Sequence, residues 1–392
     1  QSGGPTSVIN SSLAGVLETA LKSKKIGKIF GMNFGIEGFM EERLIDLGAQ
    51  AKKILPGLRR TPSSALGSSR HKVKEEDFPK IMAVLKKFKI HYFFLIGGND
   101  TMDTVNRVEA YCRKSGYELV GVGIPKTVDN DLFGTDHTPG FPSAARYNIL
   151  SAMQSGWLFR DMKRVDQYVV YQTIGRDAGW LAAATALAKR KEDDAPHLIY
   201  VPECVFEKEK FLADVESCVK KYGWVSVVCG EGIKYADGTP VSASETRDKF
   251  SNIEFGAVGG ASAGLNLHRM IKEKLGYRGE FQITESLPMC AMDRAVANDL
   301  KEAFQCGVQA VKLAEKGESG FMVSMTRAAG KKYKVGFSKV PLKDVAVHAK
   351  PMPRDFLNAA GNFVTEKFIQ YLRPLVGELP DYIEIDKKIA KS

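Results

Sequence analysis

Two carboxylates two residues apart, Asp129 and Asp131, are the side chains of this chain best suited to chemistry. Lys126 and Thr127 stand just before them, at the end of an apolar run that is typical of a buried parallel strand. Two carboxylates beside a cation suit phosphoryl transfer, because one can accept a hydroxyl proton while the other holds a metal ion. The Asp-Asn-Asp sequence is also ordinary turn chemistry, so a structural role stays open.

Three further loops contain residues that could bind an anion. Gly3 and Gly4 would let backbone N–H groups approach a phosphate at the start of the next helix, although a plain tight turn is equally open. Asp100 lies at the tip of a second glycine loop, where it could also simply cap a helix. Arg176 follows another strand, and its guanidinium can bind phosphate in a bidentate manner or form a surface ion pair.

The elements that must position these loops alternate between strands and helices, which indicates a parallel α/β sheet. Expected strands cover residues 28–33, 91–96, 119–124, 168–173, 198–201 and 225–229. Expected helices cover residues 12–23, 78–88, 143–157, 179–189, 206–222 and 365–372, with another that starts near residue 101. Because such sheets bind ligands at the carboxyl ends of their strands, the loops should meet at one edge.

We expect two doubly wound, Rossmann-like domains with mostly parallel sheets and an active site in the cleft between them. The expected larger domain covers residues 1–162 and is completed by about residues 288–340, the smaller covers 163–287, and residues 341–392 form a C-terminal helical extension. Residues 236–252 are polar and rich in turn formers, which favours a surface loop. Gln1 leads directly into a glycine loop, so we expect the chain to begin just inside a natural first strand.

Composition limits the classes of function. The 392 residues include 56 Lys and Arg against 46 Asp and Glu, a net charge of +10 that could attract nucleic acid or small polyanions. Long basic tracts interleaved with aromatic residues are missing, so phosphorylated small molecules are the expected partners, with no nucleic acid and no membrane. The six scattered cysteines form no CxxC motif, which favours reduced thiols and a cytoplasmic location. HExxH and Walker motifs are missing too.

Taken together, these segments resemble the phosphofructokinase family, and specifically its pyrophosphate-dependent branch. The matching segments are residues 1–10, 66–70, 97–101, 125–131, 174–180, 201–203 and 371–375. They occur in the right order over nearly the whole chain. The combination of Pro-Lys-Thr-Val-Asp-Asn-Asp with Gly-Arg-Asp-Ala-Gly-Trp is far more specific than any single loop.

The resemblance implies a Mg²⁺-dependent, reversible transfer from pyrophosphate to the 1-hydroxyl of fructose 6-phosphate, giving fructose 1,6-bisphosphate in glycolysis. It implies that Asp129 is the general base and that Arg176 lies near the transferring phosphoryl group. It further implies a pyrophosphate site of Gly3, Gly4, Arg70, Asp100 and Lys126, a metal site of Asp100 and Asp131, and a sugar site of Thr127, Asp129, Asp131, Ile174, Gly175, Arg176 and Glu203. Such enzymes are commonly homodimers or homotetramers.

Two residues indicate the phosphoryl donor. Members of the family that use ATP keep glycines where this chain has Asp100 and Lys126. A carboxylate at Asp100 would repel the α-phosphate of a nucleotide, whereas Lys126 can neutralise the compact pyrophosphate. The sequence therefore favours pyrophosphate over ATP.

The chain departs from the family pattern at the acceptor side. The metal-associated Asp of the glycine loop is Asn99 here, and Gln167 stands where the family usually has a cation. The glutamine-arginine pair for the sugar 6-phosphate is replaced within residues 285–289, with Met289 at the arginine in a gapless alignment and Glu285 there in a shifted one. The acceptor could therefore be another sugar or polyol, or other cations could bind the phosphate, for which the candidates are Arg164, Arg278 and Arg294. A non-catalytic subunit is a further alternative.

Overall fold

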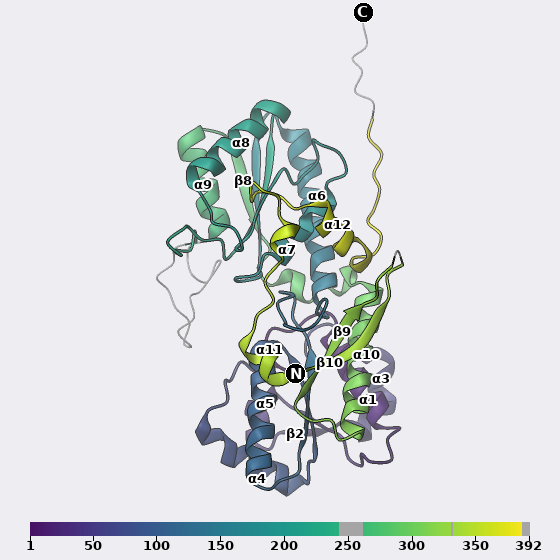
Figure 1. The fold of residues 1–392 in the computed structure, drawn as a ribbon. Helices are drawn as coiled ribbons and strands as arrows, with labels where there is room; N and C mark the ends of the chain where they lie inside the picture. Colours follow the sequence, from purple (N-terminus) through teal and green to yellow (C-terminus); the bar gives the residue numbers. More distant parts are fainter. Residues whose placement is uncertain (243–261, 331, 386–392) are drawn as a thin grey trace, which may run out of the picture.

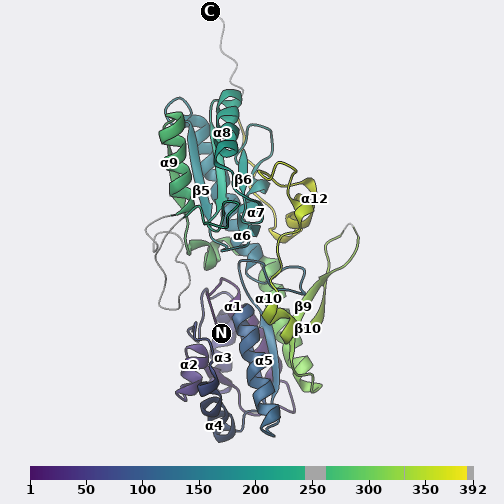
Figure 2. The ribbon, with the colours of Figure 1, turned by 60° about the vertical axis from the view of Figure 1, so that its left-hand side comes forward.

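The computed structural model describes residues 1–242, 262–330 and 332–385. It contains two four-stranded sheets, which lie in two lobes stacked end to end (Figures 1 and 2). The long helix α6 (Phe141–Met162) leads the chain from the first lobe into the second. The predicted α/β class with parallel sheets is thus confirmed.

The first lobe is built around a sheet with the strand order β10-β9-β4-β3. Its strands are β3 (Tyr92–Gly97), β4 (Val120–Pro125), β9 (Phe321–Arg327) and β10 (Val335–Pro341). The first three run parallel, while β10 pairs with β9 in the antiparallel direction. Apolar clusters cover both faces: α4 (Phe78–Phe88), α5 (Asn99–Lys114) and α11 (Leu342–Val347) on one, α1 (Ile9–Ala20), α3 (Leu47–Leu58) and α10 (Ala297–Glu315) on the other.

Helices α1 and α10 lie unusually close together because glycines face each other across the contact. A Cβ on Gly15 would collide with the backbone carbonyl of Phe304, and one on Gly307 would collide with that of Ser12. This close packing fixes the start of α1, and with it the glycine loop that precedes the helix.

The second lobe has the strand order β6-β7-β5-β8, and all of its strands are parallel. These are β5 (Tyr168–Thr173), β6 (Leu198–Tyr200), β7 (Val225–Gly230) and β8 (Gly279–Ile283). Every residue of β5 and β7 is buried, as expected for central strands covered on both faces. Helices α6 and α7 (Trp180–Ala184) cover one face, and α8 (Lys208–Tyr222) and α9 (Ala263–Leu275) cover the other.

Smaller elements complete both lobes. A two-stranded antiparallel sheet, β1 (Phe30–Met32) and β2 (Leu44–Asp46), flanks the first lobe with α2 (Gly35–Met40). The chain end crosses to the second lobe, where α12 (Glu366–Leu372) packs against α7. The 3₁₀ turns are η1 (Glu75–Asp77), η2 (Thr185–Ala188), η4 (Leu287–Met289), η5 (Met292–Arg294), η6 (Arg354–Phe356) and η7 (Arg373–Leu375).

Several predicted boundaries were wrong. The helix predicted over residues 179–189 is α7 followed by the 3₁₀ turn η2, and it ends at Ala188. The helix predicted from residue 143 begins at Phe141, because Pro142 is tolerated in a first turn, and it continues to Met162. The helix predicted over 12–23 is shifted to Ile9–Ala20, and α5 begins at Asn99 rather than near residue 101. The loop predicted over 236–252 lies outside the described residues from position 243 onward.

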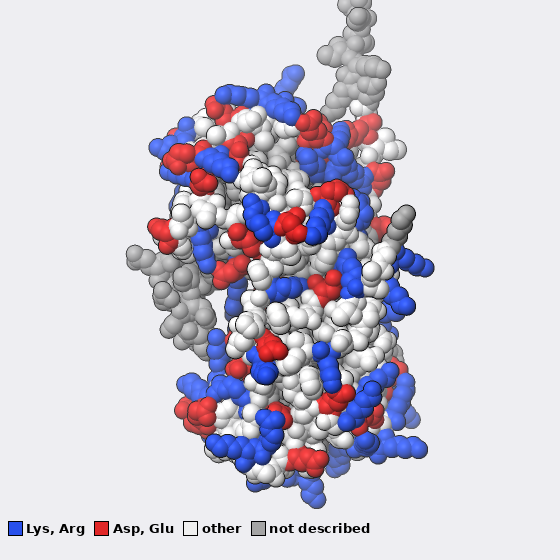
Figure 3. Space-filling model, viewed as in Figure 1, with Lys and Arg blue, Asp and Glu red and all other residues white. Residues whose placement is uncertain are grey.

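Other features bear on the predicted organisation. An apolar cavity of about 590 Å³ lies beside β3, between α1 and β1. The expected domain boundaries and the expected strand before Gln1 stay predictions. Within residues 1–242, 262–330 and 332–385, no helix is long and apolar enough to cross a membrane. On the face shown in Figure 3, basic side chains are interspersed with acidic ones rather than gathered in one tract.

Candidate active site

Three of the four predicted loops meet at Lys126. The parallel pairing of β3 with β4 sets Gly97 beside Pro125, and the Lys126 N–H donates to the Gly97 carbonyl at 3.0 Å. The Lys126 ammonium donates to the carbonyl oxygen of Gly4 at 2.7 Å. Burial lowers the pKa of Lys126 to about 8, against the nearby negative charge of Asp129, which favours the charged form. The glycine loop, the β3 loop and the β4 loop therefore form one site.

The two carboxylates of the β4 loop influence each other's protonation. Burial, and then repulsion from Asp131, raises the pKa of Asp129 to about 7. Burial also raises the pKa of Asp131. Thr127 accepts a hydrogen bond from the Asp129 N–H at 3.1 Å, and Asn130 adopts the left-handed region with φ 57°. Asp129 is consequently poised to exchange a proton near neutral pH.

The second lobe supplies Arg176, which the sequence placed in the fourth loop. The positive charge of its exposed guanidinium opposes the increase in the pKa of both Asp129 and Asp131. Arg176 therefore lies within electrostatic reach of the carboxylate pair. Its backbone is in the left-handed region, with φ 51°. Glu231 holds it there by accepting the N–H groups of Gly175 at 3.0 Å and Arg176 at 2.8 Å.

Glu231 was missed by the sequence reasoning. It directly follows β7, so the rule that ligand-binding loops follow strand ends could have found it. Burial raises the pKa of this carboxyl, which is 8% exposed. Its negative charge also acts on Asp129, so it belongs to the same electrostatic group.

Glu203 lies deeper in the second lobe than a free sugar-binding carboxylate would. Its two oxygens accept the Gly179 N–H at 3.0 and 3.1 Å, and burial raises its pKa. The Met352 N–H also points to it, at 3.4 Å. Ile174 is half-buried at the start of the loop that leads to Gly179. Glu203 therefore has a bonding role in the fold whether or not it contacts a sugar.

The predicted donor residues differ in how closely they approach Lys126. A Cβ on Gly3 would lie 3.4 Å from the Lys126 ammonium, and the charge of exposed Arg70 lowers the pKa of Lys126. Asp100 is exposed and pairs with Lys72 at 3.5 Å. Gly4 is covered from the other side by Met289, whose methyl group would collide with a Cβ at this position. Gly3, Gly4 and Arg70 thus surround Lys126, while Asp100 stands at the rim.

Asn99 and Asp131 are the candidate ligands for a magnesium ion. The Oδ1 atom of Asn99 is buried and has no hydrogen-bond partner among the described residues. Its Nδ2 lies 3.4 Å from an oxygen of Asp131. Amide and carboxylate oxygens are the ligands that Mg²⁺ takes up in proteins, usually together with water and substrate phosphates. No cluster of three His, Cys, Asp or Glu side chains that could hold a metal occurs in the described parts of the chain.

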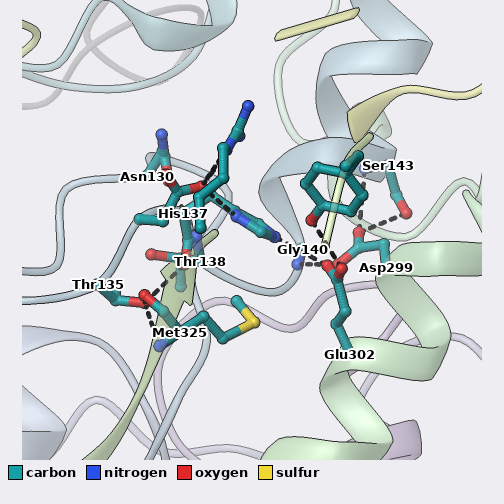
Figure 4. A network of polar contacts seen from close by, with 12 residues as sticks. Asn130, Thr135, His137, Thr138, Gly140, Ser143, Asp299, Glu302 and Met325 are labelled. Carbon is teal, nitrogen blue, oxygen red and sulfur yellow. Dashed lines mark hydrogen bonds and ion pairs between the residues drawn. The ribbon is translucent and has the colours of Figure 1, made fainter. Parts of the chain in front are cut away.

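Behind the β4 loop lies a buried polar network (Figure 4). His137 is fully buried between Asp136 and Glu302, with 2.8 Å from its ring nitrogens to each carboxylate. Burial lowers the pKa of His137, but the two carboxylates outweigh burial and raise it. The Oδ1 of Asn130 accepts the Thr138 N–H at 2.9 Å, which connects the network to the carboxylate loop.

Two of the three arginines proposed as alternative phosphate ligands have contacts within the protein, while Arg164 is exposed. Arg278 pairs with Asp166 at 3.0 Å. Arg294 lies over the ring of Tyr147 at 4.6 Å and donates to Ser151 at 3.0 Å. These contacts leave their role as phosphate ligands a prediction.

Known proteins resemble this chain over its whole length. The Phosphofructokinase family model matches residues 1–314. A pyrophosphate–fructose 6-phosphate 1-phosphotransferase of Halomonas elongata is 38% identical, covering 100% of this chain and 94% of that protein. A sulfofructose kinase of Alkalicoccus urumqiensis is 33% identical over 88% of this chain and 87% of its own length.

Solved structures give the same result. The crystal structure of a pyrophosphate-dependent phosphofructokinase from Nitrosospira multiformis has a TM-score of 0.87 at 36% identity, covering 99% of this chain and 93% of that one. The resemblance predicted from the loop motifs is confirmed. The chain belongs to the phosphofructokinase family.

Proposed function

We propose that the chain catalyses the reversible, Mg²⁺-dependent transfer of a phosphoryl group from pyrophosphate to the 1-hydroxyl of fructose 6-phosphate. The observation that carries this proposal is the meeting of Asp129, Asp131 and Lys126 from one lobe with Arg176 from the other. The names of relatives that are 37–38% identical support the same donor and acceptor.

In the proposed reaction, Asp129 accepts the proton of the acceptor hydroxyl while the oxygen of that hydroxyl bonds to phosphorus. The bridging P–O bond of pyrophosphate breaks, and inorganic phosphate leaves. A pKa raised to about 7 by burial and by Asp131 suits a base that is reprotonated in the reverse direction. Arg176 and Lys126 supply positive charge on the two sides of the transferring group.

Magnesium, when bound, would neutralise charge on the phosphoryl oxygens. We assign its ligands to Asp131 and Asn99, with Asp100 near the rim. The unpartnered Oδ1 of Asn99 supports this set. Asp131 thus serves the metal and also tunes Asp129 through its charge.

The donor follows from the same geometry. Lys126 is held against the glycine loop by the Gly4 carbonyl, where it would meet a compact anion lying over Gly3 and Gly4. Asp100 at the rim disfavours the longer polyphosphate chain of a nucleotide. We further propose a cytoplasmic, glycolytic enzyme that is a homodimer or homotetramer; the six unpaired cysteines agree with a reducing compartment.

A screen that pairs pyrophosphate or ATP with several acceptors tests the proposal. We expect turnover with pyrophosphate and fructose 6-phosphate, and none or very little with ATP. Equal turnover with fructose and with fructose 6-phosphate would contradict the proposed acceptor. Equal turnover with the two donors would contradict the roles given to Asp100 and Lys126.

A second candidate acceptor is a sugar with a different group at C6, or a polyol. In a gapless alignment Met289 takes the place of the family's arginine, and its methyl group packs on Gly4. The relative named sulfofructose kinase shows that other acceptors occur among the relatives of this chain. A non-catalytic subunit is disfavoured because Lys126, Asp129 and Asp131 are all present and lie within electrostatic reach of one another.

A further inference from the structure

The chain segment from His348 to Pro353, here the crossing segment, passes the candidate active site between the two lobes. It leaves α11, which packs on α5 in the first lobe, and leads to η6 beside α7 in the second (Figure 1). It lies beyond residue 314, where the match to the family model ends. Nothing in its sequence marked it for the site, because it follows no strand and carries no glycine motif.

At the first lobe the crossing segment pairs with the carboxylate loop. Leu132 forms an antiparallel bridge with Ala349, and the Lys350 N–H donates to the Asp131 carbonyl at 2.7 Å. The backbone of Asp131, a proposed metal ligand, is thereby hydrogen-bonded to Lys350, which lies more than two hundred positions later in the chain.

The Lys350 side chain closes the same loop from inside. Its ammonium donates to the carbonyls of Asp136 at 2.9 Å and Thr135 at 3.2 Å, and to Oδ1 of Asn130 at 3.3 Å. It also lies 5.0 Å from the ring centroid of Trp180, a second-lobe residue. All three acceptors belong to the turn that follows Asp129, so a single side-chain nitrogen ties the turn together.

At the second lobe the crossing segment reaches the candidate sugar site. Met352 is 3% exposed and packs in the core around Trp180, while its N–H points to Glu203 at 3.4 Å. Lys350 therefore contacts the loop of Asp129, and Met352, two residues later, contacts the carboxylate of Glu203. The two groups belong to different lobes, and the crossing segment sets the spacing between them.

We infer that Lys350 is a positioning residue of the active site, which holds the Asp129–Asp136 turn in its working geometry and links it to Glu203 through the crossing segment. This role rests on the proposed function, because it gives the turn a catalytic purpose. Lys350 itself acts through Asn130 and the loop carbonyls rather than on the substrate. A displacement of about 1 Å in a catalytic group can cost on the order of 100-fold in rate, so loss of these three hydrogen bonds should be visible in turnover.

The test compares Lys350→Met with Lys343→Met, an exposed position on α11 seven residues earlier. We expect Lys350→Met to lower kcat by about 10- to 100-fold while the KM for pyrophosphate changes by less than about 3-fold. Lys343→Met should leave both unchanged. Deuterium exchange should be faster in residues 130–138 and in residues 201–204 of the folded Lys350→Met protein only. If Lys350→Met does not fold, Lys350→Gln, which keeps a donor but not the charge, is measured in its place.

Unchanged kcat in the folded Lys350 variant, or equal exchange in both variants, would overturn the inference. A variant whose activity loss matches its unfolded fraction would show a merely structural lysine, which also overturns it. If the wild-type protein turns over none of the acceptors, the proposed function fails. In that case the exchange comparison alone decides whether Lys350 orders the turn.

Discussion

Replacing His137 by Gln should destabilise the protein, because it removes a positive charge from between two buried carboxylates. His137 joins Asp136 and Glu302 inside the first lobe, and its ring has no solvent exposure. Without it, Asp136 keeps the guanidinium of Arg327 at 2.9 and 3.2 Å, whereas Glu302 keeps, among the described residues, the hydroxyl of Tyr333 at 2.7 Å. Most of the lost stability should therefore come from Glu302, whose charge is left without a cationic partner among the described residues.

Removing one partner of a buried ion pair typically costs about 3 to 5 kcal/mol. Since Asp136 stays compensated, we expect the lower end, about 3 kcal/mol, for His137→Gln. In a protein of this size that corresponds to a loss of about 3 to 6 °C in Tm. The double variant His137→Gln, Glu302→Gln removes the uncompensated charge, so it should recover most of the loss.

The pH dependence of the stability loss tests this explanation independently. The folded-state pKa of His137 is raised, so its stabilising contribution is fully present below the unfolded value of about 6.5 and is lost as pH rises through the folded value. The destabilisation by His137→Gln should thus be largest near pH 6 and should shrink at alkaline pH.

Thermal unfolding of the wild type and both variants, at pH 6 and pH 9, measures these differences. The reasoning is refuted if His137→Gln costs less than about 1 kcal/mol at pH 6, well under the usual cost of an orphaned buried charge. It is also refuted if the double variant is no more stable than the single one, or if the cost grows with pH.

Four further outcomes follow from the site. Asp129→Asn should lower kcat by about 10² to 10⁴ in steady-state assays, and an unchanged rate would remove Asp129 as the base. In the wild type, kcat/KM should fall as pH drops below about 7, since the base must be unprotonated and its pKa is raised to about 7. Chelation of Mg²⁺ should abolish turnover, and Asn99→Ala should raise the Mg²⁺ concentration needed for half-maximal rate; equal requirements would exclude Asn99 as a ligand. Asp100→Gly with Lys126→Gly should weaken use of pyrophosphate and raise that of ATP, measured as the ratio of kcat/KM for the two donors; an unchanged ratio would count against both residues.

Short-range signals in the sequence were sufficient for much of the fold. Helix α4, with its apolar face and Pro79 in the first turn, and strand β5, an unbroken buried run, have the predicted bounds. The edge strand β8 was missed because none of its residues is fully buried, so it lacks both a buried run and an alternating pattern. The antiparallel β9–β10 pair was missed as well.

The site was predictable where residues follow strand ends. Lys126, Asp129 and Asp131 follow strand β4 of the first sheet and Arg176 follows strand β5 of the second, so each stands after the carboxyl end of a parallel strand. Lys350 could not be found in this way, since its contacts depend on how the chain end crosses between lobes. No local pattern encodes such a contact.

The distance along the chain between the carboxylate loop and its partners also constrains how the protein is made. Asn130 bonds to Lys350, 220 residues later, and to Tyr371, 241 residues later. At a synthesis rate of about 5 to 20 residues per second, the loop would leave the ribosome roughly 10 to 40 s before Lys350. During that interval the first lobe can form its early strands and helices, but the turn after Asp129 lacks the cation that closes it. Competence for catalysis would therefore arise only after Lys350 has been translated, so that a chain terminated before this residue holds Lys126, Asp129, Asp131 and Arg176 and yet has an unfinished site.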